Sequence, residues 1–163
     1  MNMINQFQLF SEYNKLMNQR LYETVEKLSD EIIRENKGAF FKSILGTLNH
    51  IMVGDIVWLK RFSAHPSSRY ALSYFSSLEK PESLNSILFS EFGQLREERE
   101  KIDEIIIQWI NSLSESDFDN SISYENMKGI KCNKLFSSLI SHLFLHQVHH
   151  RGQVTTLLSQ SSV

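Results

Sequence analysis

Hydrophobic residues recur at helical spacing over four long stretches of the chain. These stretches cover about 5–28, 41–62, 82 to beyond 109, and 133–160. In each of them apolar side chains follow one another three or four positions apart, the period of a helix with one buried face. Long helices with few strands predict an all-α protein, a four-helix bundle whose long second-to-third helix connection allows a crossover.

Turn-forming residues separate these stretches. Pro66 and Pro81 bracket a serine-rich segment, which predicts a loop between the second and third helices. Asp, Asn and Ser cluster again over 112–129, so a second irregular region precedes the last helix. Within that region Ile122 and Tyr124 alternate with serines, a pattern that allows a short strand or hairpin.

Composition limits the classes of protein that fit. The 163 residues are 41% hydrophobic and 22% charged, which is usual for one globular domain spanning 1–163. The net charge of -2 argues against a nucleic-acid partner, because neutralising phosphates needs an excess of Lys and Arg. No apolar run approaches the roughly 18 residues that would cross a membrane, so we expect no membrane partner either.

The start of the chain and its single cysteine favour a cytoplasmic protein. The opening segment MNMINQFQLFSEYNK lacks the basic and apolar regions of a secretion signal. Cys132 cannot form an internal disulfide, as expected in a reducing compartment. It precedes Asn133, a plausible N-cap of the last helix, and we interpret it as a buried apolar residue rather than a nucleophile.

The candidate chemistry lies on the last predicted helix. Four of the six histidines fall within the segment HLFLHQVHHRGQ. A projection at about 100° per residue gives a stripe about 80° wide that also carries Leu135, Leu139 and Leu157, and which therefore faces the core. His149 falls at the edge of the stripe. Its polar members are His142, His146, His150 and Gln153.

Imidazoles that face a core need partners. An unpaired buried polar group costs about 1–3 kcal/mol, so several of them along one helix would be hard to sustain. Neutral imidazole is a good metal ligand, and an i, i+4 pair places two ring nitrogens on one ion. His146 and His150 have this spacing, and so do His142 and His146, so spacing leaves both pairs open. Hydrogen-bonded core histidines are the alternative to a metal.

A third ligand should come from another helix that faces the same core. His65 precedes Pro66 in a predicted loop, which leaves His50, in the middle of the second helix. Gly46 and Gly54 lie four residues before and after His50, although glycine inside a helix costs about 0.5–1 kcal/mol relative to alanine. The two glycines predict either close helix packing or a small pocket above a metal.

Three segments resemble a known family. The tail HQVHHRGQVTTLLSQ closely resembles the C-terminal motif of the DinB family, the damage-inducible proteins also described as DinB/YfiT-like. The segment NHIMVGDIVWLKRF resembles the histidine-bearing second helix of that family, and FSEYNKLMNQRLYE resembles its opening helix. The three segments stand in the expected order and span most of the chain.

The resemblance implies a four-helix bundle that holds one divalent metal ion, commonly zinc or nickel, on three histidines. Matched to this chain, these ligands are His50, His146 and His150, and His142 is left to a supporting or core role. Three protein ligands leave a coordination position open, the arrangement of a catalytic site. Related proteins use a low-molecular-weight thiol as cosubstrate on a similar site.

Other polar residues are weaker candidates for the surroundings of the metal. Gln153 could donate a hydrogen bond to a ligand or to a metal-bound water, or simply pack in the core. His149 lies at the edge of the stripe. Tyr13, Asn14 and Asn18 of the first helix could line the pocket.

Several charged residues are interpreted as structural. Asp55 projects about 140° away from His50 on a helical wheel and is expected to pair with Lys60 or Arg61. The mixed-sign segment at 96–104 on the third helix predicts a solvated face. Arg151 points away from the histidine stripe.

Two classes of function follow. The first is a metal-dependent enzyme, either a hydrolase or a thiol-dependent transferase or isomerase, which acts on an unidentified small molecule in a stress or damage response. The second is a non-catalytic metal-binding protein of such a response, which the absence of an obvious general base favours. Glu91 and Glu98 on the predicted third helix are possible bases, but the sequence does not place either of them beside the metal.

A homodimer is predicted from the back of the last helix. Ile140, Phe144 and Val148 lie about 120° to 200° from His146, and a helix that is apolar on opposite sides must bury both. A partner subunit would cover this side. The alternative is that the segment 121–124 folds over it.

Overall fold

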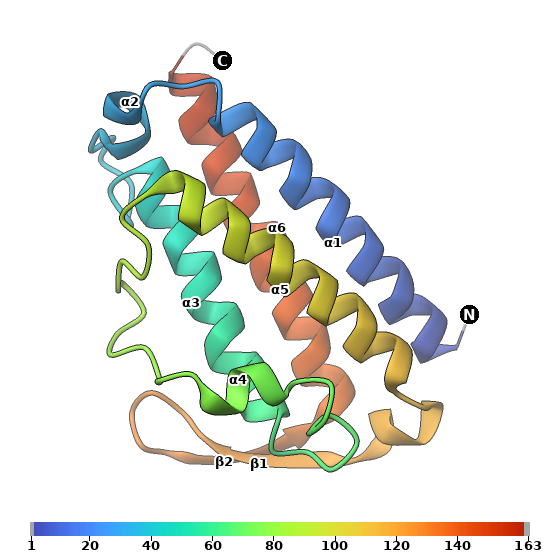
Figure 1. Ribbon diagram of the computed structural model, residues 1–163. Coiled ribbons are helices and arrows are strands. Elements are labelled where there is room, and N and C mark those ends of the chain that lie inside the picture. Colours follow the sequence, from blue (N-terminus) through green and yellow to red (C-terminus); the bar gives the residue numbers. More distant parts are fainter. Residues whose placement is uncertain (1, 162–163) are drawn as a thin grey trace.

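The computed structural model describes residues 2–161, and this part of the chain is mostly helical (Figure 1). Four long helices, α1, α3, α5 and α6, account for most of it. Two short helices, one 3-10 helix (η1) and one β-hairpin complete it. The elements are α1 (Met3–Val25), α2 (Asp30–Arg34), α3 (Ile44–Phe62), α4 (Ser73–Ser77), α5 (Phe92–Ser112), η1 (Glu115–Asp119), β1 (Ser121–Glu125), β2 (Lys131–Leu135) and α6 (Phe136–Gln160).

The four long helices pack around a shared core. Helix α1 contacts α5 and α6, and α3 contacts the same two helices from the opposite side. Helices α1 and α6 run toward one end of the molecule and α3 and α5 run toward the other (Figure 1). The segment 63–91 therefore travels back along the length of the helices, which is the crossover that the long connection allowed.

The third long helix begins later than its hydrophobic pattern predicts. Its first residue is Phe92 rather than one near 82. The side chain of Asn49 on α3 accepts hydrogen bonds from the backbone of Leu88 and Phe89, at 2.9 and 3.0 Å, and donates one to the Phe89 carbonyl. Because these backbone groups are engaged by α3, the segment 82–91 forms an irregular strap across it.

The last helix also begins later, because a hairpin precedes it. Strands β1 and β2 pair antiparallel, with Ser123 opposite Asn133 and Tyr124 opposite Cys132. The expected hairpin is confirmed, with Gly129 at a φ of 77° in its turn. The expected N-cap at Asn133 and the helical position of Cys132 are wrong, since both residues lie in β2.

The proposed dimer face on α6 is covered within the monomer. Ile140 and Phe144 are buried, and the ring of Phe144 packs against Phe7 and Phe10 of α1, at 6.4 and 6.0 Å between centroids. Neither a partner subunit nor the segment 121–124 is therefore needed to cover this side, because α1 covers it. Only Val148 of the three stays exposed.

No helix within residues 2–161 combines the length and the apolar character that crossing a membrane requires.

Candidate metal centre

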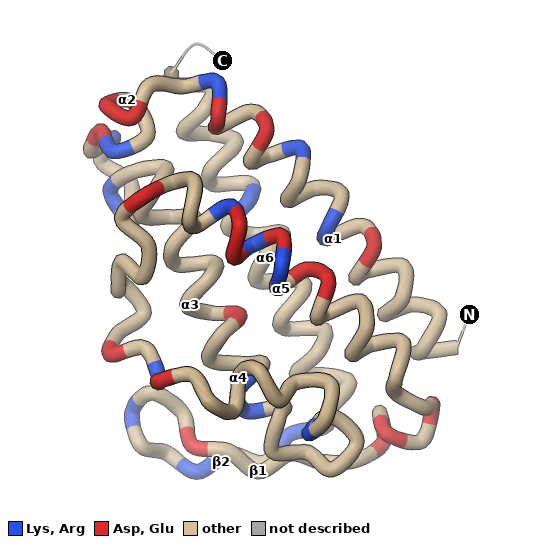
Figure 2. Tube along the Cα trace, in the orientation of Figure 1, with Lys and Arg blue, Asp and Glu red and all other residues tan. Residues whose placement is uncertain are grey.

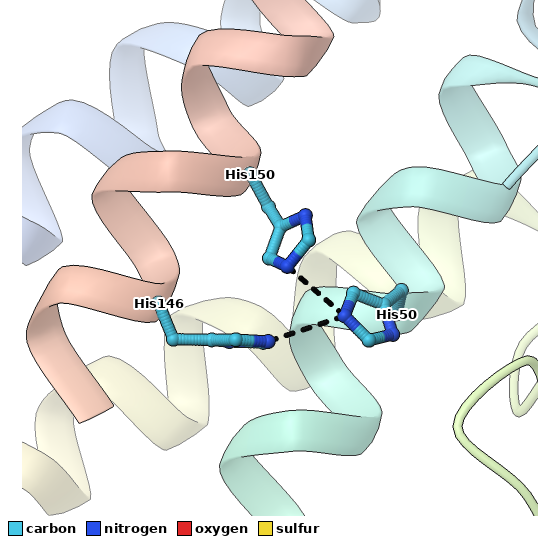
Figure 3. Close-up of side chains that lie close together, drawn as sticks. All are labelled: His50, His146 and His150. Atoms are coloured by element: carbon cyan, nitrogen blue, oxygen red, sulfur yellow. Dashed lines mark hydrogen bonds between the residues drawn. The ribbon is translucent and has the colours of Figure 1, made fainter. Parts of the chain in front are cut away.

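Three histidines from two helices converge on one point. His50 of α3 directs its Nε2 atom toward His146 and His150 of α6, with an Nε2–Nε2 distance of 3.1 Å to each (Figure 3). His50 and His150 are buried, and His146 is partly buried. Each ring offers one nitrogen to a group whose members all lie within 4.8 Å of one another.

Glycine permits this close approach of α3 and α6. A Cβ atom on Gly54 would lie 2.6 Å from Cε1 of His146, and one on Gly46 would lie 2.1 Å from the carbonyl oxygen of Phe41. Both glycines therefore make room for a neighbouring group. At Gly54, close helix packing is the interpretation that fits, since the ring of His146 fills the space beside it. Gly46 instead faces the backbone of Phe41, in the segment that precedes α3.

Hydrogen bonds fix which nitrogen carries the proton in two of the three rings, those of His50 and His150. The Nδ1 atom of His50 donates to the carbonyl of Leu84 at 2.8 Å, and that of His150 donates to Oε1 of Gln153 at 2.7 Å. A neutral ring protonated at Nδ1 has its lone pair on Nε2. Gln153 thus orients a histidine of the trio by accepting a hydrogen bond, rather than donating one as expected.

The donor set fits a metal ion. With both Nδ1 atoms protonated, the Nε2 lone pairs of His50 and His150 face each other at 3.1 Å, which is unfavourable unless a cation lies between them. Ligand nitrogens roughly 2.0–2.1 Å from a common ion are about 2.9–3.4 Å apart at ordinary coordination angles. The Nδ1 atom of His146 is buried and has no hydrogen-bond partner among the described residues.

Burial keeps the trio unprotonated. Burial lowers the pKa of His146 to about 3, with a further contribution from the neighbouring histidines. Burial also lowers the pKa values of His50 and His150. The ring of Phe41 stacks on His50 at 3.8 Å between centroids and shields it on one side. The nitrogens are therefore free of competing protons at neutral pH, as metal ligation requires.

The other histidines lie outside the trio. His142 is exposed and packs edge-on against Trp58, at 5.1 Å between ring centroids, so its expected core position is wrong. His149 is exposed as well, with its ring centroid 4.7 Å from that of His150. His65 stacks on Phe136, away from the site.

A second cluster, which the sequence did not predict, lies between the four long helices and is formed by buried polar side chains from all of them. Asp55 accepts hydrogen bonds from Arg99 and, at 2.6 Å, from Gln147, so its expected pairing with Lys60 or Arg61 is wrong. We call this group the buried polar cluster. Its members are Asn14, Asn18, Asp55, Arg99, Asp103, Gln147 and Arg151.

The charged segment of α5 is thus only partly solvated. Figure 2 shows residues of both signs along this helix, yet Arg99 and Asp103 are 2% and 3% exposed. The sequence contained an indication that Arg99 is buried, because this residue falls between Leu95 and Ile102 on the apolar stripe of α5. Asn14, expected near the metal, belongs to the buried polar cluster, and Tyr13 is half exposed on the surface of α1.

Comparison with known proteins identifies the family of the chain. The family model described as "DinB family" matches residues 3–161, and the chain belongs to the DinB family. The chain is 26% identical over 155 residues to "Protein DinB" of Bacillus subtilis (strain 168), which covers 95% of this chain and 85% of the relative. It is 21% identical to "Uncharacterized protein YizA" of the same organism, over 90% of this chain and 82% of that protein. No solved structure matches significantly.

Proposed function

We propose that His50, His146 and His150 bind one divalent metal ion, zinc or nickel, through their Nε2 atoms. The observation that carries the proposal is the pair of opposed lone pairs on His50 and His150, each fixed by a hydrogen bond from its Nδ1 atom. Without a cation, this arrangement places two acceptors against each other in a buried site. The alternative of hydrogen-bonded core histidines does not satisfy both rings at once.

We further propose that this centre is catalytic, as a hydrolase or a thiol-dependent transferase or isomerase. Three protein ligands leave a coordination position for a substrate. Such an ion would supply Lewis acidity, which polarises a substrate oxygen and lowers the pKa of a coordinated water or low-molecular-weight thiol. The chain itself contributes the orientation of the ligands, through Leu84 and Gln153, and an aromatic wall at Phe41.

A non-catalytic metal-binding role is the second candidate. It is favoured by the acidic residues, since no Asp or Glu among residues 2–161 joins the histidine trio. Glu91 is engaged by Arg34, and Glu98 accepts a hydrogen bond from the Tyr74 hydroxyl at 2.6 Å. Both candidate bases therefore have hydrogen-bond partners other than the histidines.

Two measurements test the proposal in order. Elemental analysis of the purified protein should give one zinc or nickel per chain, and less than a tenth of that in His50→Ala. A screen of the metal-loaded protein with thiols such as glutathione and cysteine, and electrophilic acceptors, then separates the two functions. Turnover that is lost in His50→Ala supports an enzyme. Full metal loading without turnover by any thiol or hydrolysable ester favours the non-catalytic role.

The broader assignment rests on the family and on the sequence. We propose a single four-helix bundle domain that works in the cytoplasm on a small molecule as part of a stress or damage response. A homodimer remains a proposal, now without the support of the Phe144 face.

A further inference from the structure

A recess between α1 and α6 lies on the other side of α6 from the histidines. The two helices contact each other, with Phe10 against Phe144 and Asn18 against Arg151. The recess has a volume of about 410 Å³, which is within the range of small-molecule sites. Its lining includes Met17, Arg20 and Leu21 of α1 and Val148, Arg151 and Leu158 of α6.

The charge of this lining is of one sign. It includes two arginines and no Asp or Glu, whereas the chain as a whole has a net charge of -2. Neither Arg20 nor Arg151 forms a salt bridge with any residue in the described range 2–161. The larger recess between α1 and α5 differs, because Lys15 and Glu104 at its rim neutralise each other.

Arg151 presents a free edge to the recess. The side chain is only 7% exposed, and its Nη1 atom donates to amide oxygens of Asn14, Asn18 and Gln147. Its Nε and Nη2 atoms have no acceptor among the described residues, and neither is sealed from solvent. These two nitrogens form one edge of the guanidinium group. In proteins generally, such an edge can bind a carboxylate through two parallel hydrogen bonds.

The rest of the recess defines the body of a ligand. Met17, Leu21, Val148 and Leu158 give it apolar walls, and hydroxyl groups stand at its rim. Burial lowers the pKa of Arg151, and the nearby carboxylates of Asp103 and Asp55 act in the opposite direction. Both carboxylates bind Arg99 directly, so a carboxylate in the recess would give Arg151 a direct ionic partner of its own.

We propose that this recess binds a small organic carboxylate, with the carboxylate on Arg151 and Arg20 and an apolar body against the walls. The site is separate from the metal centre and does not depend on it. His150 and Arg151 are consecutive but project to different sides of α6, so the two sites lie back to back across one helix.

Octanoate is a suitable probe, with octanamide as its neutral counterpart and inorganic phosphate as an anion without an apolar body. Binding to the full chain is followed by amide chemical shifts, with and without a chelator. We expect octanoate to shift Val148 and Gly152 and to bind at least about tenfold more tightly than either comparison compound. Its affinity should be unchanged by the chelator, which excludes ligation of the metal.

Variants locate the site. Arg20→Met should weaken octanoate binding several-fold, and Val148→Trp should block the recess. Arg69→Met, which removes an exposed arginine elsewhere, is the matched control and should leave binding unchanged. Arg151→Met should abolish binding; if it fails to fold, the other two variants still decide. Equal affinity for octanamide, loss of binding on chelation, or insensitivity to both Arg20→Met and Val148→Trp would each overturn the proposal.

Discussion

Gly54 of α3 lies directly against the imidazole of His146 on α6. A methyl group at this glycine would come within 2.6 Å of Cε1 and 3.0 Å of Nδ1 of that ring. The absent side chain of one helix thus sets the position of a candidate ligand on the other. It also accounts for a glycine in the interior of a buried helix, where alanine would be favoured by about 0.5–1 kcal/mol.

Gly54→Ala should therefore weaken metal binding by at least about tenfold while the fold is retained, because the ring must turn away from the other two. Competitive titration with a chromogenic chelator measures the affinity. Gly93→Ala is the matched control, since a Cβ atom there meets nothing within 4 Å. Equal affinity of the two variants would show that His146 does not need its present position.

The three ligands should not be interchangeable with their neighbours. His146→Ala and His150→Ala should each reduce the metal content of purified protein to near zero, because two imidazoles hold an ion poorly. His142→Ala should retain most of it, since His142 is exposed and packs edge-on against Trp58. If His142→Ala empties the site while His150→Ala does not, the ligand assignment is wrong.

Features of the fold and of the site that arise from local sequence patterns could be predicted from the sequence, and features that depend on distant contacts could not. The convergence of the three histidines followed from helical periodicity together with family resemblance, because i, i+4 spacing alone left His142 and His150 equal. The late start of α5 could not be predicted from the local sequence, because it depends on hydrogen bonds to Asn49, which is distant in sequence. The prediction that a partner subunit covers Phe144 was wrong, because periodicity identifies an apolar side of a helix but not which helix covers that side.

The burial of two charged residues was also not predicted from the sequence. Arg99 and Asp103 stand in a run of charges that is indistinguishable from a solvated face when only its sign pattern is considered. Their burial depends on partners from α1, α3 and α6 that no local pattern reveals. Charged residues that fall on the apolar stripe of a helix are therefore the ones to be considered for burial.

The metal-free protein should lose stability on acidification. The pKa of His146 is lowered from 6.5 to about 3, so the unfolded chain takes up this proton first as the pH falls. Its contribution is complete above the unfolded pKa and is lost as the pH falls below about 6.5. Between about pH 7.5 and about pH 5 this amounts to about 2 kcal/mol of unfolding free energy.

Urea denaturation of the chelated wild type and of His146→Asn at both pH values measures this effect. The variant should lose less stability on acidification than the wild type, by that same difference. The comparison is needed because Asp55 acts in the opposite direction: burial raises its pKa to about 6, which favours the folded state as the pH falls toward that value. Identical pH dependence of the two proteins would contradict the lowered pKa of His146.

Removal of the metal should lower the melting temperature without unfolding the chain. An ion that binds only the folded state stabilises it in proportion to the logarithm of its concentration over its dissociation constant. The core does not depend on the ion, because Trp109, Phe62 and Phe136 pack together at a distance from the trio. Thermal denaturation followed by circular dichroism, with and without chelator, tests this. A chelated protein that is unfolded at room temperature would indicate a purely structural metal.

The buried polar cluster should be the most sensitive part of the fold. Arg99 lies between Asp55 and Asp103, and its guanidinium contacts both carboxylates. Arg99→Met removes the cation and leaves two buried carboxylates together, which should cost about 3–5 kcal/mol of unfolding free energy at neutral pH. Arg34→Met is the control, because Arg34 pairs with exposed acids and its loss should cost less than about 1 kcal/mol.

Two further observations separate this electrostatic cause from lost packing. Burial already raises the pKa values of Asp55, to about 6, and of Asp103, and removing Arg99 should raise both further. The deficit of Arg99→Met should therefore shrink as the pH is lowered toward 5, as the carboxylates take up protons. For the same reason, adding Asp55→Asn and Asp103→Asn to Arg99→Met should recover part of the lost stability. A deficit that is independent of pH and is not relieved by these substitutions would mean that Arg99 stabilises the helices through its packing alone.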